Sequence, residues 1–201
     1  GGGGGVNSDS ATQPSKIIDV GKAIQFLRGQ QNEDGSLGSA LLYTDWAAVA
    51  FGAYQAANES KKIVADYLLK DPSPGTLLTD YERRAMALMA LGIDPYDGTS
   101  TNYIQNIIGG FDGNQFGDPQ LVNDDIFALF PLLNAGIANN DPMITKSVSF
   151  ILSRQEVNGS WIGIDITAAA IQALSAFSSS EGVSQALAKA KNYLKEKQDT
   201  S

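Results

Sequence analysis

Apolar residues recur along most of the chain at the spacing of helices. Segments 23–28 and 183–197 are apolar at every third or fourth position and polar between, which is the pattern of an amphipathic helix. Segments 45–54 and 165–174 are rich in Ala and other apolar residues nearly all round, so as helices they must be buried. Because the two kinds of segment alternate, the sequence predicts an all-α protein.

The alternation is an internal repeat. An amphipathic stretch, a Gln-x-x-x-Gly-x-Leu string and an apolar stretch at 23–54 return at 149–174, with Trp in place of Leu. Two more divergent copies, 61–88 and 102–129, lie between them. One aspartate stands at the start of each apolar stretch: Asp45, Asp80, Asp125 and Asp165. The positions differ by 35, 45 and 40 residues, which indicates a two-helix repeat with turns of variable length.

Pairing each amphipathic helix with an apolar one predicts a two-layered array with the apolar helices inside. We expect about four pairs and a final helix at 183–197, in one domain covering residues 16–198. Residues 1–15 are small and polar, which favours a linker or a processed terminus. Pro131 falls inside the third inner helix and is expected to kink or end it near Phe130.

The amino-acid composition limits the catalytic and binding chemistry that this chain can carry out. The 201 residues include no Cys and no His, which excludes disulfides, thiol nucleophiles, Cys/His zinc sites and imidazole-based triads. A net charge of -8 disfavours nucleic acid as a partner. No apolar run reaches the roughly 18 to 20 residues of a membrane span. We therefore expect no metal, no cofactor, no nucleic acid and no membrane span.

The repeated strings resemble a known superfamily. The motif residues are Gln31, Gly35 and Leu37 in the first copy and Gln155, Gly159 and Trp161 in the last, where Asp165-x-Thr-Ala follows. They resemble the repeats of the terpenoid cyclase and protein prenyltransferase superfamily, which includes the squalene cyclases, over nearly all of 19–197. The resemblance implies an α/α toroid, with inner helices around a central cavity and a structural role for the motif. Four and a half pairs are fewer than the enzymes of that superfamily use, so the ring is expected to be incomplete.

The resemblance also bears on function. Its prenyltransferase branch binds zinc through Asp, Cys and His, and its complement branch uses a Cys-Gln thioester, so this chain lacks both signatures. The cyclases protonate substrate with Asp-x-Asp-Asp, where this chain has Val122-Asn123-Asp124-Asp125. We therefore expect a non-catalytic module that binds a ligand or a protein. One alternative is a divergent cyclase-like enzyme with Asp165, Asp124 or Asp125 as general acid, and another is a structural spacer.

Candidate ligand-binding residues lie at the starts and along the faces of the inner helices. They are the acidic residues Asp45, Asp80, Asp125 and Asp165, the cation Arg84, and the aromatic residues Trp46, Tyr54, Tyr81 and Phe127. The four carboxylates could form a ring at one mouth of the cavity, or each could stabilise the start of its own helix. Arg84 could bind an anion or pair with Asp80 one turn away. The aromatic residues could line a pocket or pack between the layers.

The sequence also gives broad expectations for the binding partner and for the cellular location of the protein. The concave face could take a small apolar or polar ligand, or another protein domain. The Gly-rich start at 1–5 suits a tether left after removal of a targeting peptide. We expect an extracellular or cell-surface protein, and lipid-anchoring through the removed segment is one way in which it could be held at the surface.

Overall fold

The computed structural model describes residues 19–54 and 58–199, and in them it is all-α. The linker predicted at 1–15 and the first three residues of the predicted domain lie outside the described residues. The described part has nine α-helices, a 3-10 turn and no strand. The helices are α1 (Val20–Gly29), α2 (Leu41–Ala53), α3 (Asn58–Leu68), α4 (Leu78–Ala90), α5 (Tyr103–Gly109), α6 (Asn123–Asn134), α7 (Pro142–Ser153), α8 (Ile164–Leu174) and α9 (Glu181–Asp199).

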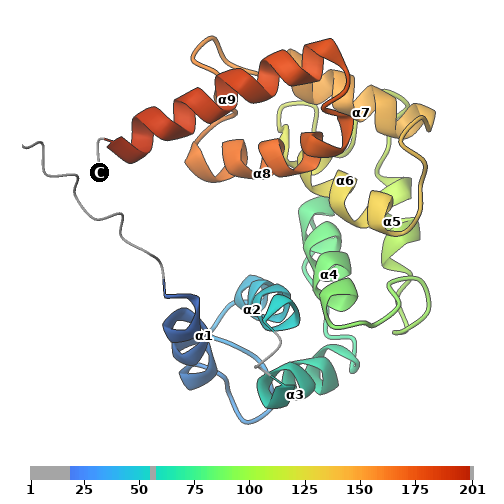
Figure 1. Cartoon of the computed structure of the whole chain (residues 1–201). Helices are drawn as coiled ribbons and strands as arrows, with labels where there is room; N and C mark the ends of the chain where they lie inside the picture. Colours follow the sequence, from blue (N-terminus) through green and yellow to red (C-terminus); the bar gives the residue numbers. More distant parts are fainter. Residues whose placement is uncertain (1–18, 55–57, 200–201) are drawn as a thin grey trace, which may run out of the picture.

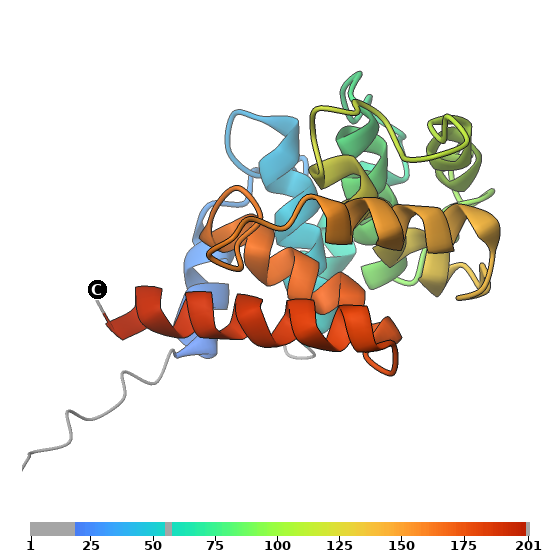
Figure 2. The same cartoon turned by 90° about the horizontal axis from the view of Figure 1, so that it is seen from above.

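The helices form an inner and an outer series. The inner helices α2, α4, α6 and α8 pack one on the next, and α3, α5, α7 and α9 each pack on the inner helix before them in the chain. Helix α1 packs on α2 at the beginning of the series. Figure 1 shows the series following an arc that is open between α1–α2 and α8–α9. In Figure 2 the long helix α9 runs along one side of the molecule, beside α8.

The composition of the inner helices explains why they lie inside. Ala47, Ala48 and Phe51 of α2 are buried, and the small side chains let neighbouring helices approach closely. The closest approach is at Gly52, where an added Cβ would lie 2.3 Å from the Ala90 carbonyl oxygen of α4. The α2–α4 contact therefore needs glycine at this position.

Outer helices are capped by side chains. Asp19, Asn102 and Asp141 precede α1, α5 and α7, and each accepts a hydrogen bond from a backbone amide in the first turn. Helix α6 runs through Pro131 and ends at Asn134, so of the two predicted effects of this proline, a kink or an end near Phe130, the end was wrong. Proline deletes one hydrogen bond of the helix, and Pro131 itself is buried among the packed layers.

The motif glutamines join the turn of one repeat to the next outer helix. Gln31 Nε2 donates to the carbonyl oxygens of Gly35 (3.3 Å) and Ser60 (3.1 Å). Gln155 Nε2 donates in the same way to those of Gly159 (3.0 Å) and Ala186 (2.8 Å). Gly35 and Gly159 have φ of 98° and 90°, a region that favours glycine. These bonds fix the distance between consecutive repeats.

Substituting Gln155 with alanine removes both bonds in the last repeat. We expect the free energy of unfolding to fall by about 1–2 kcal/mol, because each hydrogen bond contributes about 1 kcal/mol net. Chemical denaturation followed by circular dichroism measures the change. Gln120→Ala is the control, since the Gln120 side chain is exposed and only its backbone amide is hydrogen-bonded in the described part of the chain. This variant should lie within about 0.5 kcal/mol of the parent. Equal stability of both variants would contradict a linking role for Gln155.

Candidate functional site

The concave side of the arc holds an apolar groove of about 680 Å³, which we call the central groove. All four inner helices contribute to it. The lining residues are Trp46 and Val49 of α2, Met86 of α4, Phe127 and Phe130 of α6, and Asp165, Ile166, Ala168, Ala169 and Gln172 of α8. Its volume is within the range of about 300–1,000 Å³ common for small-molecule sites.

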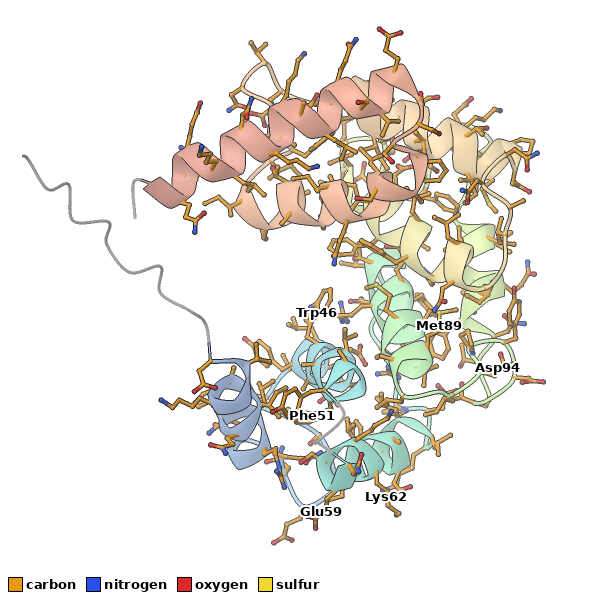
Figure 3. The ribbon with its side chains drawn as sticks, viewed as in Figure 1. Trp46, Phe51, Glu59, Lys62, Met89 and Asp94 are labelled. Carbon is orange, nitrogen blue, oxygen red and sulfur yellow. The ribbon has the colours of Figure 1, made fainter. Side chains whose placement is uncertain are left out.

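Aromatic rings form one wall of the central groove. Trp46 meets Phe127 edge to face with centroids 6.0 Å apart, and Phe127 lies 6.1 Å from Phe130. Trp46 is 42% exposed, whereas the other tryptophan, Trp161, is 0% exposed. Figure 3 shows Trp46 pointing from α2 toward the hollow of the arc and Phe51 pointing to the opposite side of that helix. The sequence prediction placed Trp46 and Phe127 among the ligand-binding candidates, and the structure brings them together.

A second hollow of about 360 Å³ adjoins Trp46 on the side of α1, and we call it the side hollow. It is lined by Phe26, Leu27, Gln30, Leu37, Gly38, Tyr43, Trp46 and Ala47. Phe26 and Tyr43 are 66% and 53% exposed, so the apolar surface continues from the central groove to α1. Trp46 is the residue common to both hollows.

Asp165 is the only charged residue of the groove lining. It lies in the first turn of α8, is exposed, and has neither a hydrogen bond nor an ion pair to its side chain among the described residues. The other candidate acids all accept hydrogen bonds, as described below. Asp165 therefore presents a free carboxylate to the groove.

In three of the repeats, a backbone amide in the turn donates a hydrogen bond to a side chain of the inner helix that follows. The amides of Leu37 and Trp161 donate to the hydroxyls of Thr44 and Thr167, both at 2.9 Å. The amide of Phe116 donates to Asp125 Oδ1 at 3.1 Å. Asp125 is thus equivalent to the two threonines and not to the other aspartates.

The prediction that four aspartates occupy one register was therefore wrong. Asp45 comes one residue after Thr44 and Asp165 two residues before Thr167, so the two positions are three residues out of register. Asp45 is completely buried, whereas Asp165 is exposed and lines the central groove. Asp45 is also the fifth residue of α2 and does not precede the helix. No three Asp or Glu residues in the described part of the chain are grouped so that they could hold a metal ion. The predicted ring of carboxylates is absent from the described residues.

Asp45 instead belongs to a buried ion network between α2 and α4. Arg84 Nε donates to Asp45 Oδ1 at 2.6 Å, and Arg83 Nε donates to Oδ2 at 3.2 Å. Arg84 Nη1 also donates to the Pro72 carbonyl oxygen at 2.7 Å. Burial raises the pKa of Asp45, while the guanidinium groups of Arg84 and Arg83 oppose that shift. These groups hold two helices together and do not line the central groove.

Asp80 stabilises the start of α4. Its Oδ2 accepts a hydrogen bond from the Leu77 amide at 3.0 Å, and its Oδ1 accepts one from Arg83 Nη2 at 2.9 Å. The predicted pairing of Asp80 with Arg84 was wrong, because Arg84 turns to Asp45 across the helix interface. Arg84 is completely buried in this network, so it does not present a free cation to a ligand.

The sequence prediction missed one buried acid, Glu82 on α4. Glu82 is 0% exposed and neither carboxyl oxygen has a hydrogen-bond partner. Burial, with smaller contributions from Asp124 and Asp125 on α6, holds the pKa of Glu82 well above its ordinary range. No motif in the sequence marks Glu82, because the α6 residues near it, Asp124 and Asp125, lie about forty positions away in the chain.

Asp124 and Asp125 lie in the first turn of α6. Asp124 Oδ2 accepts a hydrogen bond from the Asp118 amide at 2.9 Å, and burial raises its pKa. Burial raises the pKa of Asp125 to about 7, and the Ser147 hydroxyl and the Phe116 amide oppose this. No hydrogen bond of good geometry joins Asp125 Oδ2 and Ser147 Oγ. Neither aspartate lines the central groove.

The remaining aromatic candidates lie elsewhere. Tyr81 packs on Tyr103 with centroids 6.0 Å apart and lines a shallow hollow between α4 and α5. Tyr54 follows α2, and its hydroxyl faces Gly21 of α1. Of the nine ligand-binding candidates, the structure places three, Trp46, Phe127 and Asp165, in the central groove.

Comparison with protein-family models, with curated proteins and with solved structures finds no match to this chain. Among the described residues, no helix is both long and apolar enough to cross a membrane. Function must therefore be argued from the geometry of the site.

Proposed function

We propose that this chain is a non-catalytic binding module that takes an apolar ligand into the central groove. The observation that carries the proposal is the half-exposed Trp46, stacked edge to face on Phe127 over a hollow that all four inner helices line. An aromatic wall of this kind stabilises a ligand by removing apolar surface from water. A protein that only separated two other domains would not need this surface, which disfavours the alternative of a structural spacer.

The proposal extends to architecture and location. The repeated turn bonds of Gln31 and Gln155 and the inner and outer helix series support an incomplete α/α toroid, similar to the terpenoid cyclase and prenyltransferase repeats. We place the module outside the cell or at its surface, on the composition of residues 1–15 alone.

The enzymatic alternative has less support. A cyclase-like general acid needs a carboxylic acid of raised pKa in contact with a closed apolar cavity. Asp165 lines the groove but is exposed, whereas Asp124, Asp125 and Glu82 are buried and do not line it. The buried acids therefore lie away from the apolar wall of the groove, and the one acid in the groove lining is exposed to water.

Binding of a neutral apolar dye tests the proposed function. We expect N-phenyl-1-naphthylamine to bind the full chain with a rise in dye fluorescence, and Trp46→Ala to weaken it at least fivefold. The reason is the loss of a large aromatic contact, which typically contributes 1 kcal/mol or more at a binding site. Val157→Ala, which shortens a fully exposed apolar side chain outside the groove, is the matched control and should leave the affinity unchanged. Equal dye binding by all three proteins would contradict the proposed site.

A further inference from the structure

We infer that the ligand of the central groove is a small amphiphilic cation, an apolar chain that carries an ammonium group beside Asp165. The inference rests on the proposed function and specifies its ligand class. It is argued from the charge of the lining, the chemistry of the aromatic wall and the shape of the two hollows.

The groove lining has one negative charge and no positive one. Its ten residues include Asp165 and no Lys or Arg. The carboxylates of Asp45 and Asp80 are paired with arginines, and those of Asp124 and Asp125 accept backbone amides. Asp165 has no such partner in the described part of the chain. A positively charged ligand group would supply the missing partner, whereas an anion would meet only repulsion.

The aromatic wall favours the same charge. Trp46 and Phe127 belong to the same lining as Asp165, and Phe130 extends their wall along α6. Aromatic faces attract ammonium groups, and tryptophan does so most strongly. The ring faces and the carboxylate would thus stabilise the head of the ligand together.

The shape of the surface favours an elongated ligand. The central groove and the side hollow meet at Trp46, and the exposed Phe26 and Tyr43 continue the apolar path toward α1. A head group near Asp165 leaves this path for an apolar chain. A flexible alkyl chain would bury its methylenes there, each contributing to affinity through the hydrophobic effect.

Three ligands with the same eight-carbon chain test the inference: octyltrimethylammonium, octyl glucoside and octanoate, all below their micelle concentrations. Trp46 is exposed and Trp161 is fully buried, so a change in tryptophan fluorescence on binding reports the groove. We expect the cation to bind tightest and octanoate weakest. In Asp165→Asn the cation should lose about fivefold in affinity, since an exposed charge pair contributes on this scale, and octyl glucoside should be unaffected.

Asp97→Asn is the matched control, because Asp97 is exposed in the loop between α4 and α5, away from the groove lining. This variant should retain the parent's preference for the cation. Raising the salt concentration should reduce the preference in the parent and in Asp97→Asn, and have little effect in Asp165→Asn.

The outcomes separate the inference from the function on which it rests. Equal binding of the three ligands, or no loss in Asp165→Asn, would overturn the cationic ligand and leave an apolar groove in place. In that case Asp165 would only stabilise the start of α8, and its substitution would lower the melting temperature alone. If none of the three binds, while a Lys-containing apolar peptide does, the small-molecule ligand is overturned. If neither the three ligands nor the peptide binds at the groove, the proposed function itself is overturned.

Discussion

Replacing Asp45 with asparagine is expected to lower the free energy of unfolding by about 3–5 kcal/mol. The carboxylate is 0% exposed and lies between two arginines, with Arg84 Nε only 2.6 Å from Oδ1. Asparagine keeps the shape but removes the charge, and its amide nitrogen would face an Nε–H group where an acceptor is needed. Two guanidinium groups would then remain between α2 and α4 without their shared carboxylate. Removing one partner of a buried ion pair is strongly destabilising because it leaves the other charge buried and uncompensated.

Urea denaturation of Asp45→Asn, followed by far-ultraviolet circular dichroism, measures this loss. The matched control is Asp66→Asn, because Asp66 pairs with Lys62 on the exposed side of α3 at 2.7 Å. Exposed pairs contribute little, so this variant should differ from the parent by less than about 1 kcal/mol. Similar stabilities for the two variants would mean that the Asp45 network does not hold α2 against α4.

The second large effect has the opposite sign: Glu82→Gln is expected to stabilise the protein by about 2 kcal/mol at pH 8. The buried Glu82 carboxyl has no hydrogen-bond partner for either oxygen. An ionised carboxylate in this position lacks both water and a counter-ion, so the folded state favours the neutral acid. Glutamine is neutral at every pH and has nearly the same shape.

The pH dependence of stability follows from the direction of the shifts. The pKa of Glu82 is raised in the folded protein above its ordinary value of 4.5, so the folded state binds protons that the unfolded state has released. The stabilisation that protonated Glu82 contributes is complete below pH 4.5, and it is lost as the pH rises through the pKa of Glu82 in the folded protein. Asp125 adds a loss of the same sign between its ordinary value of 3.8 and about 7. The parent should therefore become less stable as the pH rises from 4 to 8.

Thermal unfolding between pH 4 and pH 8 measures both effects. The parent should lose stability across this range, and Glu82→Gln should lose less, with the remaining slope due to the raised pKa values of Asp125, Asp124 and Asp45. Glu33→Gln is the control, since Glu33 is exposed in the turn after α1, and it should follow the parent. A Glu82→Gln variant that is less stable than the parent at pH 8 would show that the carboxylate has a partner that stabilises it.

Helical periodicity was sufficient to predict the helices and their layers. The Ala-rich stretch at 45–54 falls in α2 except for Tyr54, the stretch at 165–174 falls in α8, and the amphipathic stretch at 183–197 lies within α9. The burial of the two Ala-rich stretches was predicted only in part. Ala47 and Ala48 are buried, but Trp46 of α2 and Ala168 of α8 are exposed on the concave side, although both stretches are apolar nearly all round. The spacing of Gln31 and Gly35 likewise marked a turn, since the two residues bond to each other four positions apart. The second bond of Gln31, to Ser60 in the next repeat, could not be read from that spacing.

The site was harder to predict, because its residues meet through turns of different lengths. Trp161 and Thr167 are six positions apart, Leu37 and Thr44 are seven apart, and Phe116 and Asp125 are nine apart, although the three pairs make equivalent bonds. Aligning aspartates by sequence alone therefore put Asp45 and Asp165 in a common register that the helices do not share. The partner of Arg84 was missed for a related reason, as Asp45 lies 39 positions away on another helix.

The open side of the arc has a mechanical consequence. Helices α2 and α8, the first and last of the inner series, face each other across the opening in Figure 1 and do not pack together as consecutive inner helices do. A closed ring would fix its own diameter, whereas here the width depends on three interfaces in series, α2–α4, α4–α6 and α6–α8. Trp46 of α2 and Asp165 of α8 lie on the two sides of this opening, so the packing angles at the three interfaces set the distance between the aromatic wall and the carboxylate.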